Sequence, residues 1–214
     1  MKEIYIIGAG TYGEAMFELA EACGYDVVGF YDEDDSKIGT DVMGVAVLDK
    51  FSILKDSDII GKNFVVAIGN NKIRHNIMTD INSRGGFTPT LIHPSAQITK
   101  SAKIGNGVYI QMGAVIWTKV ELGDYVIISP NTVIAHHTKI GHSSLISTMS
   151  AIGANLCVGE YCFFGFGSIV ITGINSVGKN VMLGAGTTVT KDVGDNVLLV
   201  GSPARVIRER DAIE

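Results

Sequence analysis

The chain has 214 residues, which is enough for one large domain or two small ones. Apolar residues make up 46% of it and charged residues 18%, and these fractions predict a substantial packed core. The net charge of −5 and the lack of any long basic run argue against an electrostatic grip on a nucleic-acid backbone. No apolar stretch approaches the roughly 20 residues of a membrane span, and Met1–Gly8 does not resemble a signal peptide. We therefore expect a cytoplasmic protein that binds neither nucleic acid nor membrane.

The three cysteines are Cys23, Cys157 and Cys162, which are widely spaced and odd in number. None forms a Cys-x-x-Cys pair, so we expect reduced core thiols rather than a disulfide or a metal site.

Residues 1–89 alternate between short apolar strands and helices. The expected elements, in chain order, are a strand at Ile4–Ile7, a glycine-rich turn at Gly8–Gly13, a helix from Glu14 to about Cys23 with Ala15, Leu19 and Ala22 on one face, strands at Val27–Tyr31 and Phe64–Ile68, and a helix carrying Arg74 and Ile77. Strands that alternate with helices predict an α/β domain with a parallel sheet, in which ligands bind at the carboxyl ends of the strands.

The turn after the first strand suits a bound pyrophosphate. Gly8 permits a tight turn, Gly10 lets the backbone approach a phosphate, and Gly13 lets the helix pack close to the strand. Asp32 ends the second strand and can accept a hydrogen bond from a ribose hydroxyl or a base N–H. Taken alone this pattern is a weak dinucleotide motif, and the second half of the chain argues against a dehydrogenase.

A second polar segment falls at the same sheet edge. Gly69, Asn70 and Asn71 follow the third strand, and their amides can contact a base or sugar hydroxyls. Arg74, one helical turn later, is expected to reach phosphate, and the alternative is a simple turn with a surface arginine.

From residue 92 onward the sequence has a six-residue period. Large apolar residues stand six apart without a polar exception at Ile92, Ile98, Ile104, Ile110, Ile116, Leu122, Ile128, Ile134, Ile140, Ile146, Ile152, Val158, Phe164 and Val170. One extra residue near Thr172–Ser176 shifts the phase, and Val177, Leu183 and Val189 resume it. This period fits neither a helix nor an alternating strand and predicts a solenoid of triangular coils.

These features together resemble the hexapeptide-repeat acyltransferases, whose fold is a left-handed parallel β-helix. The N-terminal half adds a resemblance to the bacterial sugar-nucleotide acetyltransferases that place a Rossmann-like domain first, including the bacillosamine-pathway and perosamine N-acetyltransferases and the sialic acid O-acetyltransferases. The segments that carry the resemblance are Gly8–Gly13, Ala67–Arg74, Ile92–Ala96, Val133–His137 and Gly201–Arg205. It implies a Rossmann-like domain over 1–89, a β-helix with a C-terminal tail over 90–214, and a homotrimer.

The resemblance implies a nucleotide-linked amino sugar and acetyl-CoA as substrates, and no metal. The nucleotide-sugar would contact Gly8, Gly10, Tyr12, Gly13, Asp32, Gly69, Asn70, Asn71 and Arg74. Acetyl-CoA would lie between adjacent β-helices, along Gly153, Ala154, Ala185, Gly186, Lys191, Pro203 and Arg205. The Ala154 backbone N–H, one coil past His136, is the candidate donor to the oxyanion of the tetrahedral intermediate.

The resemblance places the general base at His136, which we expect to point outward from a coil corner. An imidazole titrates near neutral pH and can take the proton that an amine loses on acylation. Many relatives carry an acidic residue next, where this chain has His137, so the partner that orients His136 is not identified. We therefore expect N-acetylation of a 4-amino-4,6-dideoxy sugar nucleotide by direct transfer, in bacterial surface glycan biosynthesis.

Several alternatives stay open at this point. A sugar or sialic acid O-acetyltransferase would use the same base on a hydroxyl group, and the nucleoside and the sugar are undetermined. A non-catalytic nucleotide-sugar-binding protein could share the fold. A zinc-dependent carbonic anhydrase would use His137 and His142, but Ser101 stands where its third histidine is expected.

Overall fold

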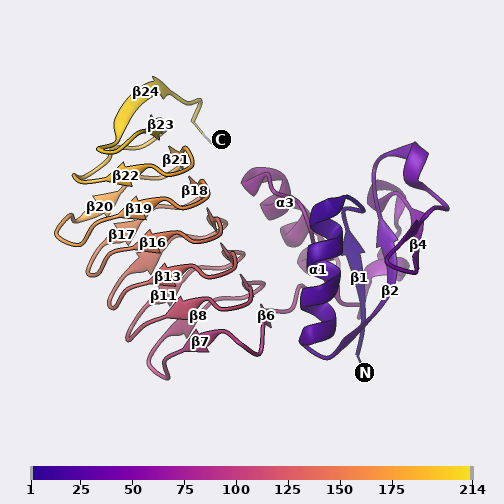
Figure 1. Ribbon diagram of the computed structural model, residues 1–214. Coiled ribbons are helices and arrows are strands. Elements are labelled where there is room, and N and C mark those ends of the chain that lie inside the picture. Colours follow the sequence, from indigo (N-terminus) through magenta and orange to yellow (C-terminus); the bar gives the residue numbers. More distant parts are fainter. Residues whose placement is uncertain (1, 213–214) are drawn as a thin grey trace. The chain divides into compact units, whose positions relative to one another are not determined.

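The computed structural model describes residues 2–212, which form two compact units that divide between Leu91 and Ile92. We describe each unit by itself (Figure 1). No helix within residues 2–212 is long and apolar enough to cross a membrane.

The first unit is a five-stranded sheet with helices, in the strand order β3-β4-β2-β1-β5. Its strands are β1 (Lys2–Ile7), β2 (Tyr25–Tyr31), β3 (Asp41–Val42), β4 (Val45–Asp49) and β5 (Phe64–Val66). All neighbours are parallel except the β3–β4 hairpin. The helices are α1 (Thr11–Ala22), α2 (Asp56–Ile59) and α3 (Asn71–Ser83), with 3-10 turns η1 (Asp35–Lys37) and η2 (Phe51–Ile53). The predicted α/β class is confirmed.

Helix α1 begins at Thr11, earlier than the expected Glu14, because Gly10 already adopts the extended conformation of an N-cap residue. Its buried face is made by Gly13, Met16, Phe17, Leu19 and Ala20. The expectation for Ala15 was wrong, since this residue is exposed. Gly24 ends the helical segment at φ +81°, in the left-handed region that glycine tolerates.

The second unit is a three-sided parallel β-helix, whose coils stack regularly in Figure 1. Its six-stranded sheet holds β7 (Gln97–Ile98), β10 (Val115–Ile116), β13 (Val133–Ile134), β16 (Ala151–Ile152), β19 (Ile169–Val170) and β22 (Thr188–Val189). Its five-stranded sheet holds β8 (Lys103–Ile104), β11 (Glu121–Leu122), β14 (Lys139–Ile140), β17 (Cys157–Val158) and β20 (Ser176–Val177). The eight-stranded sheet holds β6 (Leu91–Ile92), β9 (Tyr109–Ile110), β12 (Ile127–Ile128), β15 (Leu145–Ile146), β18 (Phe163–Phe164), β21 (Met182–Leu183), β23 (Val197–Val200) and β24 (Arg205–Glu209).

Strand pairing confirms the sequence period. Ile116 pairs with Ile134 and Ile134 with Ile152, so a residue lies beside the one a whole coil away. The predicted phase shift is also confirmed, because Val158 pairs with Val177 rather than with the residue before it. The second residue of each coil strand points into the interior, where the large apolar side chains form one continuous core. The core is less well covered at the two ends, with Ile92 38% exposed in the first coil and Val197 partly buried in the last.

Small hydroxyl side chains fill the interior near the corners and are hydrogen-bonded there. Thr138 Oγ1 donates to the Gly153 carbonyl at 2.7 Å, and Ser144 Oγ donates to the Gly159 carbonyl at 3.1 Å. Each bond spans 15 residues and ties one corner to the next coil. The narrow part of each coil therefore accepts a polar residue without leaving its hydroxyl unsatisfied.

The three cysteines are not in disulfides. Cys162 is fully buried, and burial raises the pKa of its thiol to about 12, as expected for a core thiol. Cys157 departs from the expectation because it is exposed on the five-stranded sheet, where the first residue of each strand points outward.

We predict that Gly141→Ala destabilises the β-helix by about 2 kcal/mol or more, because a new Cβ would lie 2.4 Å from the Glu160 backbone nitrogen in the next coil. Gly194→Ala is the matched control, since no atom lies within 4 Å of its Cβ position. Urea unfolding followed by circular dichroism measures both variants. Equal stability of the two variants would contradict this account of coil stacking.

Candidate functional site

Three strand ends of the first unit meet at the glycine-rich turn. Gly8 follows β1, Asp32 follows β2 and the Gly69–Asn71 segment follows β5. The Gly8 N–H donates to the Tyr31 carbonyl at 2.7 Å, and a Cβ on Gly8 would lie 2.9 Å from the Ala67 carbonyl oxygen. Glycine at this position is therefore required by close packing as well as by its φ of +106°.

The end of α1 beyond this turn is open to a ligand. Gly10 caps the helix without a side chain, and no atom lies within 4 Å of its Cβ position. Gly13 differs, because a Cβ there would lie 2.1 Å from the Gly8 carbonyl oxygen. The two glycines thus have the separate purposes expected from the sequence: Gly10 leaves space at a helix N-terminus, and Gly13 packs the helix against the turn.

Asp32 is already engaged by its own unit. Its Oδ2 accepts the Ala9 N–H at 2.7 Å and the Lys37 Nζ at 2.9 Å, and its Oδ1 accepts the Asp34 N–H at 3.0 Å. Burial raises the pKa of this carboxyl, but the bonds from Lys37, Asp34 and Ala9 outweigh burial and hold the pKa below its ordinary value. Asp32 therefore stays ionised at neutral pH and fixes the turn.

Lys37 is a site residue that sequence reasoning missed. It comes from η1, and its side chain is 34% exposed while its Nζ is bonded to Asp32 beside the glycine-rich turn. The only sequence signal is a lone lysine after the acidic run Asp32–Asp35, which by itself suggests a solvated loop.

Arg74 requires a correction. We expected Arg74 to reach phosphate, with a plain surface arginine as the alternative, but its side chain is fully buried. Its guanidinium donates to the Ile68 carbonyl at 3.0 Å and to Asn71 Oδ1 at 2.8 Å. Asn70 accepts the Ile73 N–H and so caps α3. Arg74 therefore braces the Gly69–Asn71 turn from within, which leaves Gly69 and Asn70 as its exposed members.

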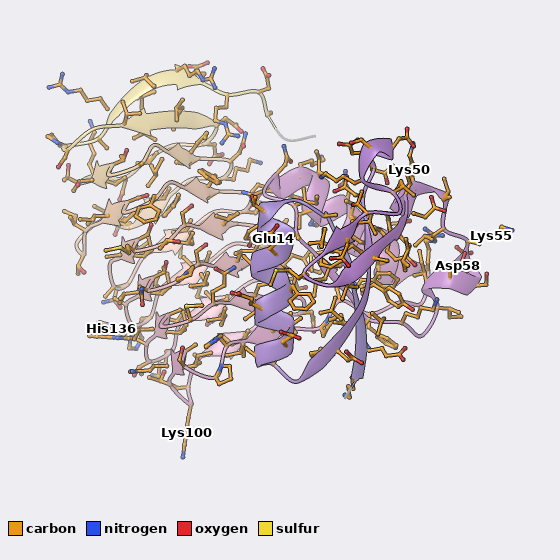
Figure 2. The ribbon with its side chains drawn as sticks, turned by 45° about the vertical axis from the view of Figure 1, so that its right-hand side comes forward. Glu14, Lys50, Lys55, Asp58, Lys100 and His136 are labelled. Atoms are coloured by element: carbon orange, nitrogen blue, oxygen red, sulfur yellow. The ribbon has the colours of Figure 1, made fainter. Side chains whose placement is uncertain are left out.

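In the second unit, His136 lies at the corner between β13 and β14, as expected. Figure 2 shows its side chain projecting from the flank of the β-helix. The corner is held on both sides, since the His137 N–H donates to the Thr118 carbonyl at 2.9 Å and the Asn155 N–H donates to the His136 carbonyl at 3.1 Å. His137 has φ +61°, the left-handed corner position that Asn155 occupies one coil later at φ +58°.

Two aromatic neighbours hold the His136 ring. Its Nδ1 lies 3.1 Å from the Nδ1 of His137, with the two ring planes at 87°. Trp117, one coil earlier, stacks nearly parallel to it, with the ring centroids 6.2 Å apart and the planes at 23°. The partner that sequence analysis left open is therefore His137, and Trp117 is a half-exposed aromatic surface beside the candidate base.

The Ala154 amide, the expected oxyanion donor, has a hydrogen-bond partner within the β-helix. Its N–H already donates to Thr172 Oγ1 at 3.1 Å. A hydroxyl that accepts one bond still has its own proton to donate, so exposed Thr172 is the group that this corner column presents. Gly153, expected along CoA, is also required by coil stacking, because a Cβ there would lie 2.5 Å from the Thr172 nitrogen.

The last coils form a cleft of about 430 Å³ beneath the β23–β24 hairpin. Its lining combines Lys191 and Arg205 with apolar residues that include Val193, Leu199 and Val206. Two cations that sequence analysis assigned to CoA thus share one concave surface. Ala185, Gly186 and Pro203, assigned to the same ligand, are exposed in these coils but do not line the cleft.

No group of three or more His, Cys, Asp or Glu side chains suited to a metal ion occurs within residues 2–212.

Comparison with known proteins assigns the class. Residues 3–81 match the PglD N-terminal domain, and residues 101–136 match the bacterial transferase hexapeptide model of six repeats. Together with a full-length relative of 30% identity, these matches show that the chain belongs to the hexapeptide-repeat acyltransferases with an N-terminal PglD domain. The predicted left-handed β-helix after an α/β domain is the fold of this class, and the prediction of an acyltransferase is confirmed.

Three relatives are similar to this chain along most of its length. PerB from Caulobacter crescentus, solved with CoA and GDP-perosamine, is 30% identical with a TM-score of 0.88, over 97% of this chain and 98% of that one. The acetyltransferase domain of PglB from Neisseria gonorrhoeae, solved with acetyl coenzyme A, is 31% identical with a TM-score of 0.86, over 96% and 99%. GDP-perosamine N-acetyltransferase from Escherichia coli O157:H7 is 27% identical over 92% of this chain and 82% of its own.

Another relative is similar over a shorter stretch. Galactoside O-acetyltransferase from Lactococcus lactis is 31% identical over 112 residues, so the chain matches about half, 54%, of that protein's length.

We predict that Asp32→Asn lowers the free energy of unfolding at pH 7 by about 1 kcal/mol, because it weakens the bonds to Ala9 and Lys37. The folded-state pKa of Asp32 is depressed, so its contribution is fully present above the ordinary pKa of 3.8 and is lost as the pH falls through the folded value. Urea unfolding of the wild type and of Asp32→Asn, at pH 7 and below pH 3.8, measures how the loss of stability changes with pH. Lys37→Met, which removes only the bond from Lys37, is the matched control. A deficit that stays constant down to low pH would contradict the charge-based account.

Proposed function

We propose that this protein transfers the acetyl group of acetyl-CoA to the amino group of a nucleotide-linked 4-amino-4,6-dideoxy sugar, in bacterial surface glycan biosynthesis. The observation that carries the proposal is His136, an imidazole at an exposed coil corner whose ring is held by His137 and Trp117. It is supported by full-length similarity to an enzyme solved with CoA and GDP-perosamine.

The nucleotide-sugar binds the first unit. Its pyrophosphate lies at the N-terminus of α1, where Gly10 leaves the backbone accessible beside Gly8, Tyr12 and Gly13. Exposed Gly69 and Asn70 contact the base or the sugar at the neighbouring strand end. Lys37 takes over the phosphate contact first assigned to Arg74, because its ammonium is accessible beside the turn whereas the Arg74 guanidinium is buried.

The protein acts as a homotrimer. Half-exposed apolar side chains gather on the six-stranded sheet and its two corners, and we call this surface the apolar face: Met112, Trp117, Met149, Phe166, Ile169 and Ile171. The five-stranded sheet differs, because Glu121 lies 3.6 Å from both Lys103 and Lys139 in a ladder of charges. An apolar side beside a charged side supports burial of the apolar face against a second copy of the chain.

Acetyl-CoA lies along the apolar face and extends towards the last coils. Lys191 and Arg205 in the C-terminal cleft pair with its phosphates, and Gly153, Ala185, Gly186 and Pro203 lie along its path. The Thr172 hydroxyl, or the Ala154 N–H that it now accepts, donates to the oxyanion.

The reaction follows from these positions. His136 removes a proton from the amine, the nitrogen adds to the thioester carbonyl, and the tetrahedral intermediate collapses with release of CoA. Cys162 is excluded as a nucleophile because it is buried and its thiol is protonated. Cys157 is exposed on β17, where it pairs with Lys139 rather than with the His136 corner, so we propose direct transfer without an acetyl-enzyme.

A hydroxyl acceptor is the second candidate. Similarity of the β-helix to galactoside O-acetyltransferases from Lactococcus lactis and Escherichia coli supports it. Those alignments cover 54% and 44% of the two proteins, whereas the amine-acetylating relatives align along most of their length.

We predict thiol release from acetyl-CoA with a nucleotide-linked 4-amino-4,6-dideoxy sugar, and loss of about 10²–10⁴ in kcat for His136→Asn, because removal of a general base costs this much. His142→Asn is the control, since His142 lies on another corner with its ring 4.8 Å from Tyr161. Light scattering checks that each variant keeps the mass of the wild type.

A panel that pairs each amino sugar with its hydroxy counterpart decides between the two acceptors. If only the hydroxy sugars are turned over, the acceptor is a hydroxyl group and the proposed amine acceptor is wrong. Full activity of His136→Asn would contradict the assignment of His136 as the general base.

We predict that Lys191→Ala and Arg205→Ala each raise the KM for acetyl-CoA about tenfold with little change in kcat, because a lost charge-assisted contact costs about 1.4 kcal/mol. Lys100→Ala is the control, an exposed lysine of the first coil that is labelled in Figure 2. Initial rates at varied acetyl-CoA give both constants. An unchanged KM in both variants would place CoA elsewhere.

A further inference from the structure

The His136–His137 pair is a contact between two nitrogens that must share one hydrogen. The two Nδ1 atoms lie 3.1 Å apart, and a hydrogen bond at this distance needs one ring to donate and the other to accept. If His137 donates, His136 carries its own hydrogen on Nε2 and cannot take a proton there. If His136 donates, its Nε2 has a free lone pair. Only the second tautomer gives the base that the proposed function needs.

The two rings differ in their access to water. His136 is half-buried, with Trp117 stacked against its ring, whereas His137 is exposed at the corner. Within one chain a proton on His137 can therefore pass to water, whereas the His136 ring contacts its two aromatic neighbours.

The charged groups around the pair are mainly cations. Lys119 occupies the corner position of His137 one coil earlier, Asn155 occupies it one coil later, and Lys139 follows on β14. Glu121 is the acidic residue of the adjoining strand, and it lies 3.6 Å from Lys103 and from Lys139. Within residues 2–212 no carboxylate is bonded to the His136 ring, and His137 is the hydrogen-bonding side chain that contacts it.

We propose that His137 is a positioning residue that also relays the proton of the acetyl transfer between His136 and water. The inference rests on the proposed function. As the amine nitrogen bonds to the thioester carbon, its proton moves to His136 Nε2, the His136 Nδ1 proton moves to His137 Nδ1, and the His137 Nε2 proton moves to water. His136 stays neutral throughout this step.

The relay then runs in reverse. As the carbon–sulfur bond breaks, the CoA thiolate takes the proton on His136 Nε2. His137 Nε2 takes a proton from water, and its Nδ1 proton returns to His136 Nδ1. One proton leaves to solvent and one returns, so a neutral amine and acetyl-CoA give the amide and CoA thiol with every atom and charge balanced.

The chain offers a substitution that isolates proton transfer from backbone geometry. Asn131, Asn155 and Asn180 already occupy left-handed corner positions, at φ of +55°, +58° and +53°. His137→Asn therefore fits the corner, and its carbonyl oxygen still accepts the His136 Nδ1 proton, but it cannot carry a proton onward. Lys119→Asn is the matched control, since Lys119 is exposed at the same corner position with φ +56°.

The experiment measures kcat and both KM values for the wild type, His137→Asn and Lys119→Asn, with and without added free imidazole as a soluble proton carrier. We expect kcat of His137→Asn to fall about 10- to 100-fold with unchanged KM values, and to recover several-fold with imidazole, because the carrier replaces the missing relay. Lys119→Asn keeps the wild-type kcat. Nitrogen NMR of the resting wild type should show His136 protonated at Nδ1.

Three results overturn the relay: a wild-type kcat in His137→Asn, a lowered kcat that imidazole does not raise, or a resting His136 protonated at Nε2. All three are distinct from a failure of the proposed function. In that case the wild type itself releases no thiol from acetyl-CoA with any nucleotide sugar, and the relay falls with it.

Discussion

The stacking of coils in the β-helix is the constraint on which the rest of this protein depends. Parallel pairing places Val115 beside Val133 and Val133 beside Ala151, so position along the chain becomes height along the solenoid. The coils lie so close that a methyl group on Gly141 or Gly159 would meet backbone atoms of the following coil. The backbone is rigid at these contacts, and a side chain on a corner inherits that rigidity.

This rigidity explains how a site can be built on corners that are otherwise turns. His136 and His137 are consecutive residues, yet the left-handed backbone at His137 sets their rings perpendicular and brings the Nδ1 atoms together. Trp117 contributes from the coil before, which is distant in sequence but adjacent in the solenoid. The geometry of the candidate site is therefore fixed by hydrogen bonds between coils.

The first unit solves a similar problem by another route. The Gly69–Asn71 turn is braced from inside by the buried Arg74 guanidinium, and the glycine-rich turn is held by the ionised Asp32 carboxylate. Arg74 and Asp32 both hydrogen-bond to the backbone. The groups that remain for the proposed ligand are the N–H groups at the start of α1 and the Lys37 ammonium. A turn that is already fixed loses little conformational entropy when it binds a phosphate, and it accepts the phosphate in one orientation only.

The sequence by itself determined the fold class, because a six-residue period indicates a solenoid, a βα alternation indicates a parallel sheet, and the family resemblance supplied the hand of the β-helix. It also determined the phase shift near Thr172–Ser176 and the corner position of His136, since both follow from counting residues along the repeat. The tertiary structure alone decided which charges are accessible. A helical arginine after a glycine-rich turn has the same local pattern whether its guanidinium points to solvent or folds under the turn, and only the packing of α3 on β5 settled this for Arg74. The same holds for Trp117 and Thr172, whose partners lie in other coils. Contacts of that kind depend on distances in space that no local pattern encodes.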